Sequence, residues 1–232
     1  GLVFSSPSTR TRCSFESAIK RLGGNTIYLD LSSSGTSASK GESFHDTLRA
    51  MEIYCDGLII RTTHNISSEI NSLSQSLDIS VINAGDDSQH PTQALADLMT
   101  IRAERGSINN LKIAIVGDLK HARTAHSLVA LLINYNVEFY FVADDLLQIP
   151  ENITKMINDN PSNTTMSYKK YELLEEVIEN VDVIYMTRLH SEKIYNAQTT
   201  MDNTQTTSDN IYNDAYKKNL LGSSIYSSSK AA

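Results

Sequence analysis

Residues 2–12, LVFSSPSTRTR, join a short apolar run to the start of a helix-like segment near Cys13. The apolar residues 2–4 have the composition of a buried strand, and hydroxyl and guanidinium groups follow them in residues 8–12. The first backbone N–H groups of a helix have no partner within it, and the helix dipole is positive at that end. This stretch therefore predicts a site for a phosphate or carboxylate. A Ser- and Thr-rich helix start is also an ordinary capping arrangement, and that alternative stays open.

The composition limits the class of protein. The chain has 232 residues, a net charge of -7 and 40% hydrophobic residues, which suffices for one large or two ordinary domains. The negative balance argues against nucleic acid, since a phosphate backbone requires clustered Lys and Arg. No apolar run reaches the roughly 20 residues of a membrane span, and no basic-then-apolar leader begins the chain. We expect a cytoplasmic protein with no nucleic-acid or membrane partner. Because the chain opens at Gly1, without an initiator Met and just before an expected core strand, we also expect a fragment or a chain trimmed at its N-terminus.

The two cysteines, Cys13 and Cys55, have no His at ligand spacing. They indicate neither a disulfide framework nor a zinc site, and we expect both side chains to be buried. His121 and His126 are five residues apart and do not share one helix face, so we expect no metal there. Gly117 ends an apolar run, but a dinucleotide site needs several glycines, and we exclude it.

Strand-like and helix-like segments alternate, which indicates parallel sheets covered by helices. We predict an α/β protein of two domains, each a parallel β-sheet flanked by helices, at 1–105 and 106–194, with the boundary along a helix from Pro91 to Arg105. The polar tail 195–232 has little to bury, and we expect no regular structure in it. The expected strands are 2–4, 26–29, 57–60, 79–82, 111–116, 137–142 and 181–185, and the other expected helices are 13–22, 47–54, 66–77, 124–134, 153–159 and 173–180.

Polar residues follow most of the expected strands, and in open α/β sheets ligands bind beyond the C-terminal strand ends. Four arginines and a histidine near one cleft would fit substrates that carry several negative charges. Each Arg alone is more often a solvated surface residue, and His90 alone is more often structural. A position before Pro91 at a helix start favours a neutral imidazole that donates a hydrogen bond. The candidates are Ser8, Thr9, Arg10, Thr11, Arg61, His90, Gln93, Arg123 and Arg188.

Several short segments, taken in order, resemble the aspartate carbamoyltransferase catalytic chain, and the resemblance covers roughly residues 3 to 194. The Ser-Thr-Arg-Thr and His-Pro-Thr-Gln elements are similar to those of ornithine carbamoyltransferases too, whereas the segments around Lys40, Arg123 and Arg188 are similar to the aspartate branch. The segments are PSTRTR at 7–12, SKGES at 39–43, NAGD at 83–86, HPTQ at 90–93, VGDLK at 116–120, RT at 123–124, HSL at 126–128 and YMTR at 185–188.

The resemblance implies transfer of a carbamoyl group from carbamoyl phosphate to the amine of L-aspartate, in pyrimidine synthesis, with no cofactor. It implies that Ser8, Thr9, Arg10 and Thr11 hold the phosphate; that Thr11, Arg61 and His90 stabilise the oxyanion; that Gln93 orients the carbamoyl amide; and that Arg123 and Arg188 bind the aspartate carboxylates.

The resemblance also implies a homotrimer with shared active sites, because in the family a loop reaches into the neighbouring subunit's site. Thr36 and Lys40 occupy the loop positions where the family has a Ser and a Lys. A loop that closes over a bound phosphate fits this stretch, and an ordinary solvated loop fits it as well. A regulatory chain is neither indicated nor excluded.

Three departures from the family pattern leave alternatives open. Ser6 stands where an acidic residue is usual, and His190 stands where a Gln is usual. The family's His-Pro-Leu-Pro loop and its final helix have no counterpart after Arg188, nor is there a helix before Gly1. Beside an active aspartate carbamoyltransferase, a second hypothesis is therefore a truncated or non-catalytic homologue that binds anions and associates with other subunits. An ornithine-type enzyme is a third, disfavoured by Arg123 and Arg188.

Overall fold

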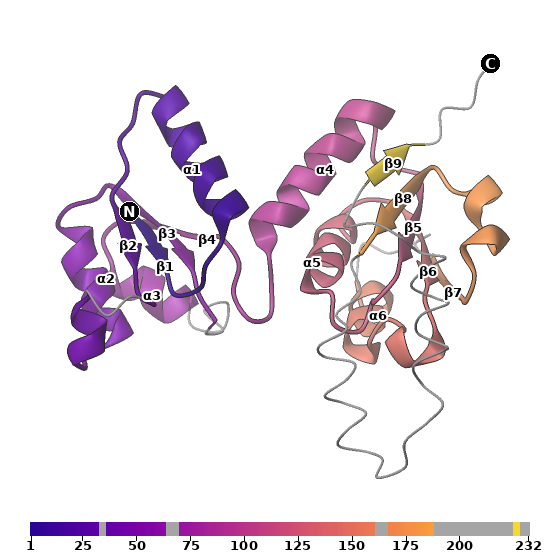
Figure 1. The fold of residues 1–232 in the computed structure, drawn as a ribbon. Coiled ribbons are helices and arrows are strands. Elements are labelled where there is room, and N and C mark those ends of the chain that lie inside the picture. Colours follow the sequence, from indigo (N-terminus) through magenta and orange to yellow (C-terminus); the bar gives the residue numbers. More distant parts are fainter. Residues whose placement is uncertain (33–35, 64–69, 161–166, 188–224, 228–232) are drawn as a thin grey trace, which may run out of the picture. The chain divides into compact units, whose positions relative to one another are not determined.

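The computed structural model describes residues 1–32, 36–63, 70–160, 167–187 and 225–227. It divides into two compact units, Gly1–Thr92 and Gln93–Ala232, which we call the N-terminal and C-terminal units. Both are α/β (Figure 1).

The N-terminal unit is built on a four-stranded sheet with the order β2-β1-β3-β4, in which every neighbouring pair is parallel. In β1 and β3, Phe4 is the partner of Arg61, so both strands end at the same edge. Its strands are β1 (Leu2–Phe4), β2 (Tyr28–Asp30), β3 (Gly57–Arg61) and β4 (Ser80–Asn83), and its helices are α1 (Thr9–Arg21), the 3-10 turn η1 (Ser37–Lys40), α2 (Phe44–Glu52) and α3 (Ile70–Ser76).

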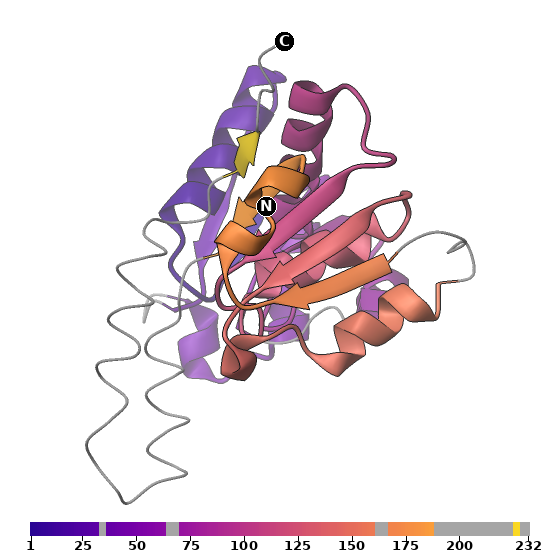
Figure 2. The ribbon, with the colours of Figure 1, turned by 90° about the vertical axis from the view of Figure 1, so that its right-hand side faces the viewer.

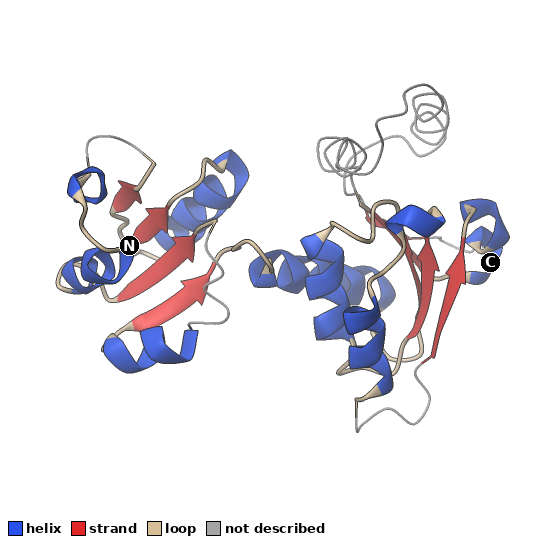
Figure 3. Cartoon of the chain, turned by 90° about the horizontal axis from the view of Figure 1, so that it is seen from below, coloured by secondary structure: helices blue, strands red, loops and turns tan. Residues whose placement is uncertain are grey.

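Helices cover both faces of this sheet (Figure 3). On one face, Leu48 of α2 and Leu73 of α3 pack on Ile60 of β3. On the other face, Phe15 and Ile19 of α1 pack on Phe4 and its neighbours. The alternation along β3 explains this arrangement, because successive strand residues point to opposite faces.

The C-terminal unit has a five-stranded sheet with the order β7-β6-β5-β8-β9. Four strands are parallel, and β9 joins β8 in the antiparallel sense. Its strands are β5 (Lys112–Val116), β6 (Glu138–Val142), β7 (Ser167–Tyr171), β8 (Val183–Met186) and β9 (Ile225–Ser227); the helix α4 (Pro91–Arg105) leads into it, and α5 (Arg123–Leu132), η2 (Asp145–Leu147), α6 (Glu151–Asn158), η3 (Leu174–Glu176) and η4 (Ile178–Asn180) follow.

The larger core lies on one face of this sheet, where Ile101 of α4, Leu128 of α5 and Ile157 of α6 pack against β5, β6 and β8. Val177, between η3 and η4, closes the opposite face with Tyr140 and Met186. Figure 2 shows η3 and η4 in orange on that side of the sheet. Both sheet faces are thus covered, as a mostly parallel sheet requires.

The predicted fold class is confirmed, since both units are helix-covered parallel sheets. Three segments differ from the prediction. The strand β7 was not predicted, because its sequence SYKKY has no apolar alternation and its side chains are largely exposed. Residues 173–180 form two 3-10 turns instead of one helix. The tail, where we expected no regular structure, contributes β9, which pairs with β8 through the backbone.

The prediction that both cysteines are buried was wrong. Cys13 is exposed, because it lies on the outer face of α1, and Cys55 is half-buried beside the core of the N-terminal unit. In the part of the chain that the structure describes, no helix is long and apolar enough to cross a membrane.

Candidate active site

The predicted anion site begins at Ser8, which caps α1 in an extended conformation with φ -156°. The Ser8 carbonyl accepts a hydrogen bond from the N–H of Arg12, but the Ser8 side chain caps no backbone N–H. The first turn of this 13-residue helix contains no acidic residue that would offset the dipole. The hydroxyl of Ser8 and the first N–H groups of α1 thus remain available for an anion.

The two arginines of this stretch have different surroundings. Arg12 is paired, since its Nε lies 3.1 Å from Oε1 of Glu16 and its guanidinium lies 3.7 Å above the ring of Tyr28. These contacts raise the pKa of Arg12, with the Glu16 hydrogen bond as the main cause. Arg10 is exposed and makes no hydrogen bond or ion pair within the described ranges. Arg10 is therefore the one of the two that can take an external anion.

Arg61 ends β3 and approaches His90, a residue 29 positions later in the chain. Its Nη1 donates to the Ala84 carbonyl at 3.2 Å and lies 3.3 Å from Nε2 of His90. A guanidinium can only donate, so this contact fits a neutral His90 that accepts through Nε2 and carries its proton on Nδ1. Two predicted catalytic residues are thus brought together.

Gly85 makes this approach possible. Its φ is +114°, and a Cβ at this position would lie 2.8 Å from Nη1 of Arg61 and 3.3 Å from the ring of His90. The backbone conformation therefore requires glycine, and a Cβ would displace the end of the Arg61 side chain from its place beside His90. The motif containing Gly85 was visible in the sequence, but its role depends on the side chain of Arg61, which comes from another strand.

Asp86 organises the loop that carries His90 into α4. Its side chain is fully buried and accepts hydrogen bonds from the backbone N–H groups of Ser88 and Gln89 at 2.9 and 2.7 Å and from the Asn83 amide at 3.0 Å. The sequence analysis included Asp86 in the NAGD segment but gave it no role; the available signal was an acidic residue followed closely by Ser and by His-Pro.

The two loop residues predicted to reach a neighbouring site, Thr36 and Lys40, lie at the 3-10 turn η1. Lys40 is the last residue of η1 and is exposed, and Thr36 is half-buried. Within the described ranges Lys40 forms no hydrogen bond or ion pair, so the structure does not bring it to Arg61 or His90. Its assignment to the site stays a prediction.

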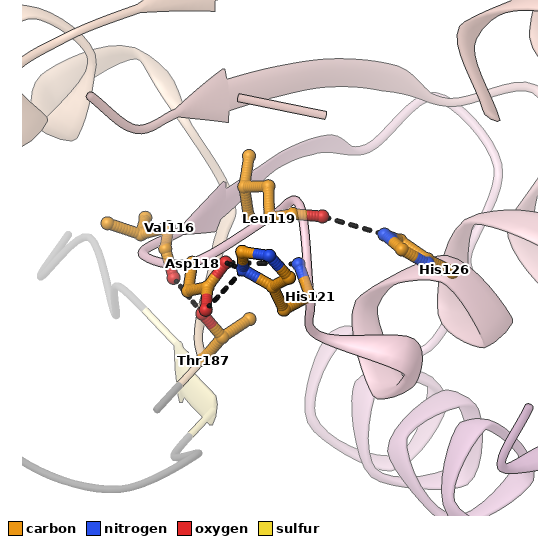
Figure 4. Close-up of polar contacts among 6 residues, drawn as sticks. All are labelled: Val116, Asp118, Leu119, His121, His126 and Thr187. Atoms are coloured by element: carbon orange, nitrogen blue, oxygen red, sulfur yellow. Dashed lines mark hydrogen bonds and ion pairs between the residues drawn. The ribbon is translucent and has the colours of Figure 1, made fainter. Parts of the chain in front are cut away.

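In the C-terminal unit, Asp118 shapes the turn that starts α5 (Figure 4). This carboxylate is fully buried, accepts a hydrogen bond from the His121 backbone N–H at 3.0 Å and lies 3.0 Å from Nδ1 of the same residue. Arg123, the first residue of α5, follows directly and donates its backbone N–H to the His121 carbonyl at 3.0 Å. Asp118 thereby fixes the position from which the Arg123 side chain starts.

A second contact joins the ends of β5 and β8. Thr187 donates its hydroxyl and its backbone N–H to the Val116 carbonyl, at 3.0 and 2.8 Å. Gly117 has φ +113°, and a Cβ there would lie 2.5 Å from the Thr187 hydroxyl oxygen. Only glycine permits this contact. Arg188 and His190, both singled out from the sequence, lie outside the described residues.

His121 and His126 have different partners, as Figure 4 shows. Nε2 of His126 lies 2.7 Å from the Leu119 carbonyl, to which it donates, and burial lowers the pKa of this ring. His121 instead faces Asp118. Within residues 1–32, 36–63, 70–160, 167–187 and 225–227, no group of three or more His, Cys, Asp or Glu could hold a metal ion.

Gln93, on the first turn of α4, donates its side-chain N–H to Oδ1 of Asp97 at 2.8 Å. Asp97 is only 6% exposed, although it is an acidic residue on a helix. Sequence reasoning identified Gln93 but missed Asp97, because an acidic residue four positions along a helix usually faces solvent.

Comparisons with known proteins identify the family. The family model of the aspartate/ornithine carbamoyltransferase carbamoyl-P binding domain matches residues 1–103, and that of the Asp/Orn binding domain matches residues 109–216. An aspartate carbamoyltransferase catalytic subunit from Methanobrevibacter smithii is 48% identical over 195 residues, which are 83% of this chain and 60% of that protein. The chain thus spans about three fifths of the length of this relative.

Solved structures give the same result. The catalytic subunit of M. jannaschii aspartate transcarbamoylase matches with a TM-score of 0.77 and 39% identity, over 92% of this chain and 64% of that one. The Trypanosoma cruzi enzyme in complex with carbamoyl phosphate and aspartate matches with a TM-score of 0.74 and 34% identity, over 83% of this chain and 60% of that one. With both domain models matched in order along the chain, this chain belongs to the aspartate/ornithine carbamoyltransferase family.

Proposed function

We propose that this chain transfers a carbamoyl group from carbamoyl phosphate to the amine of L-aspartate, giving N-carbamoyl-L-aspartate and phosphate, as a step of pyrimidine biosynthesis. The observation that carries the proposal is the 3.3 Å approach of Arg61 Nη1 to Nε2 of His90. Arg61 lies at the C-terminal end of β3, next to the C-terminal end of β1. The chain continues from β1 into α1, whose first backbone N–H groups are available for an anion. The similarity of this chain to a solved aspartate transcarbamoylase in complex with carbamoyl phosphate and aspartate also supports the proposal.

In this reaction the aspartate amine attacks the carbonyl carbon, so a C–N bond forms and negative charge develops on the carbonyl oxygen. The C–O bond to phosphate then breaks, phosphate leaves, and the proton lost by the amine passes to the departing phosphate. We assign the oxyanion to Arg61, Thr11 and the Nδ1–H of His90, each contributing roughly 3 kcal/mol in the transition state. We assign the phosphate to Arg10, Ser8, Thr9 and the first N–H groups of α1.

The other assignments follow the chemistry of the side chains. Gln93 binds the carbamoyl amide, and Arg123 and Arg188 bind the two carboxylates of aspartate, for which the planar guanidinium is well suited. We further propose a homotrimer in which Thr36 and Lys40 serve the site of a neighbouring subunit, and a cytoplasmic location. The reaction as written needs no cofactor.

The test is an assay of carbamoyl aspartate formation, with ornithine as the competing acceptor. We expect product from aspartate only, and we expect His90→Ala to lose about a hundredfold in kcat. His45→Ala is the matched control, because His45 is an exposed residue of α2 that has no assigned role. No product with either acceptor would favour the non-catalytic alternative, and citrulline would reassign the chain to the ornithine branch.

A further inference from the structure

The interior of the C-terminal unit holds a carboxyl group that the proposed reaction does not use. Asp97 lies one helical turn after Gln93 on α4, on the side that packs into the larger core with Ala94 and Ile101. Its Oδ1 accepts the Gln93 hydrogen bond at 2.8 Å. Within the described ranges this is its one well-formed hydrogen bond, and it has no cationic partner.

Tyr185 of β8 is the polar neighbour of Asp97. The two groups interact electrostatically, but Oδ2 of Asp97 and the Tyr185 hydroxyl are both buried and make no hydrogen bond of good geometry among the described residues. Burial raises the pKa of Asp97, and burial together with the nearby Asp97 raises the pKa of Tyr185. The strongest polar contact of Asp97 is therefore Gln93.

A buried carboxyl with one hydrogen bond is unfavourable for folding, and an apolar residue of similar volume would suit the core better. Its presence therefore calls for a function. An ionised carboxylate only accepts hydrogen bonds, so it selects the NH2 end of the Gln93 amide. The other end, the Oε1 acceptor, is then left for a ligand. A carbamoyl NH2 group donates two hydrogen bonds and needs such an acceptor.

We propose that Asp97 is a positioning residue that holds the Gln93 amide with Oε1 toward the substrate, so that the site prefers a carbamoyl over an acyl phosphate. This inference rests on the proposed function. Acetyl phosphate is the diagnostic probe, because it has CH3 where carbamoyl phosphate has NH2 and is otherwise nearly the same shape. The preference for carbamoyl phosphate over acetyl phosphate measures the hydrogen bond from the carbamoyl NH2.

The experiment measures the dissociation constants of carbamoyl phosphate, acetyl phosphate and inorganic phosphate by calorimetry. In Asp97→Leu, which has no acceptor but similar volume, the carbamoyl preference should fall roughly three- to tenfold, the value of one neutral hydrogen bond, with phosphate affinity unchanged. Asp97→Asn still offers an acceptor oxygen and should keep most of the preference. Such rescue would not follow from a merely structural role.

Tyr185→Phe is the matched control, because it removes a buried hydroxyl beside Asp97 and leaves the Gln93 contact in place. Its preference should match the unmodified chain. A retained preference in Asp97→Leu, or an equal loss in Tyr185→Phe, would overturn the inference. If the unmodified chain binds carbamoyl phosphate no better than inorganic phosphate, the proposed function fails first, so the two failures are distinguishable.

A second measurement keeps the inference testable if Asp97→Leu does not fold. In the unmodified chain, the side-chain amide 15N signal of Gln93, identified by its loss in Gln93→Leu, should shift with pH in step with the carboxyl 13C signal of Asp97. A Gln93 signal that does not follow Asp97 would contradict the contact.

Discussion

Nη1 of Arg61 lies 3.3 Å from Nε2 of His90, although the two residues belong to different segments of the N-terminal unit. A side chain at Gly85 would displace this contact, because a Cβ there would lie 2.8 Å from the same Nη1. Gly85→Ala should therefore separate the two groups and reduce kcat about a hundredfold, the effect of losing one oxyanion donor.

Gly23→Ala is the control for this substitution. Gly23 also has a positive φ, +85°, but a Cβ there meets nothing within 4 Å. Both variants should lose about 1–2 kcal/mol of unfolding free energy in urea, because both force alanine into the left-handed region. Only Gly85→Ala should lose activity, and equal activity in the two variants would contradict the argument.

The arginine pair at the start of α1 gives a second prediction. Arg10→Gln should weaken phosphate binding about tenfold or more, as expected for a lost charge-assisted contact, and leave the melting temperature unchanged. Arg12→Gln should lower the melting temperature and leave phosphate binding unchanged, because the Arg12 side chain contacts Glu16 and Tyr28. Calorimetry with inorganic phosphate and a thermal melt of each variant check both. A tenfold loss of binding in Arg12→Gln would reverse our assignment.

The buried carboxyl of Asp97 predicts a dependence of stability on pH. Its pKa is raised in the folded chain, so the folded state holds this proton more tightly than the unfolded state does. Asp97 therefore costs stability as the pH rises from its unfolded pKa of about 3.9 through its folded pKa, and the cost levels off above that. Asn has no such titration.

The measurement is the difference in unfolding free energy between Asp97→Asn and the unmodified chain, from urea titrations at several pH values. The Asn variant should be the more stable at pH 7.5, and its advantage should shrink toward pH 4. A difference that is constant with pH would show that Asp97 does not titrate abnormally.

The contact between Gly117 and Thr187 predicts non-additive effects. Gly117→Ala should raise the KM for aspartate, because its Cβ would collide with the Thr187 hydroxyl at the end of the strand that leads to Arg188. Adding Thr187→Ala removes the nearest colliding atom and should restore part of the affinity, although the φ of +113° remains strained. A double-mutant cycle on KM tests this, and simple additivity would exclude the steric explanation.

The alternation of apolar and polar segments was enough to predict most of the architecture. The starts of α4 and α5 were predicted within a residue or two, because Pro91 and the run before Gly117 are strong local signals. The strand β7 was missed because its partner β6, and not its own residues, stabilises it. The roles of Asp86 and Asp97 were missed because burial of an acid depends on groups brought close by the fold.

In the candidate site, too, some features could be predicted from the local sequence and others depend on the fold. Arg61, His90 and Gln93 could be selected because each follows a predicted strand. Which nitrogen of His90 bears the proton, and which end of the Gln93 amide is occupied, depend on partners that only the folded chain supplies.

The pairing of β1 with β3 sets Arg61 opposite Phe4. Side chains alternate along a strand, so a slip of one residue would turn the guanidinium onto the face where Ile60 packs under α2 and α3, away from His90. A chain with shifted strands would keep its helices and its compactness but bind no phosphate. Anion affinity therefore reports strand alignment during refolding, which spectroscopic measures of secondary structure would not detect.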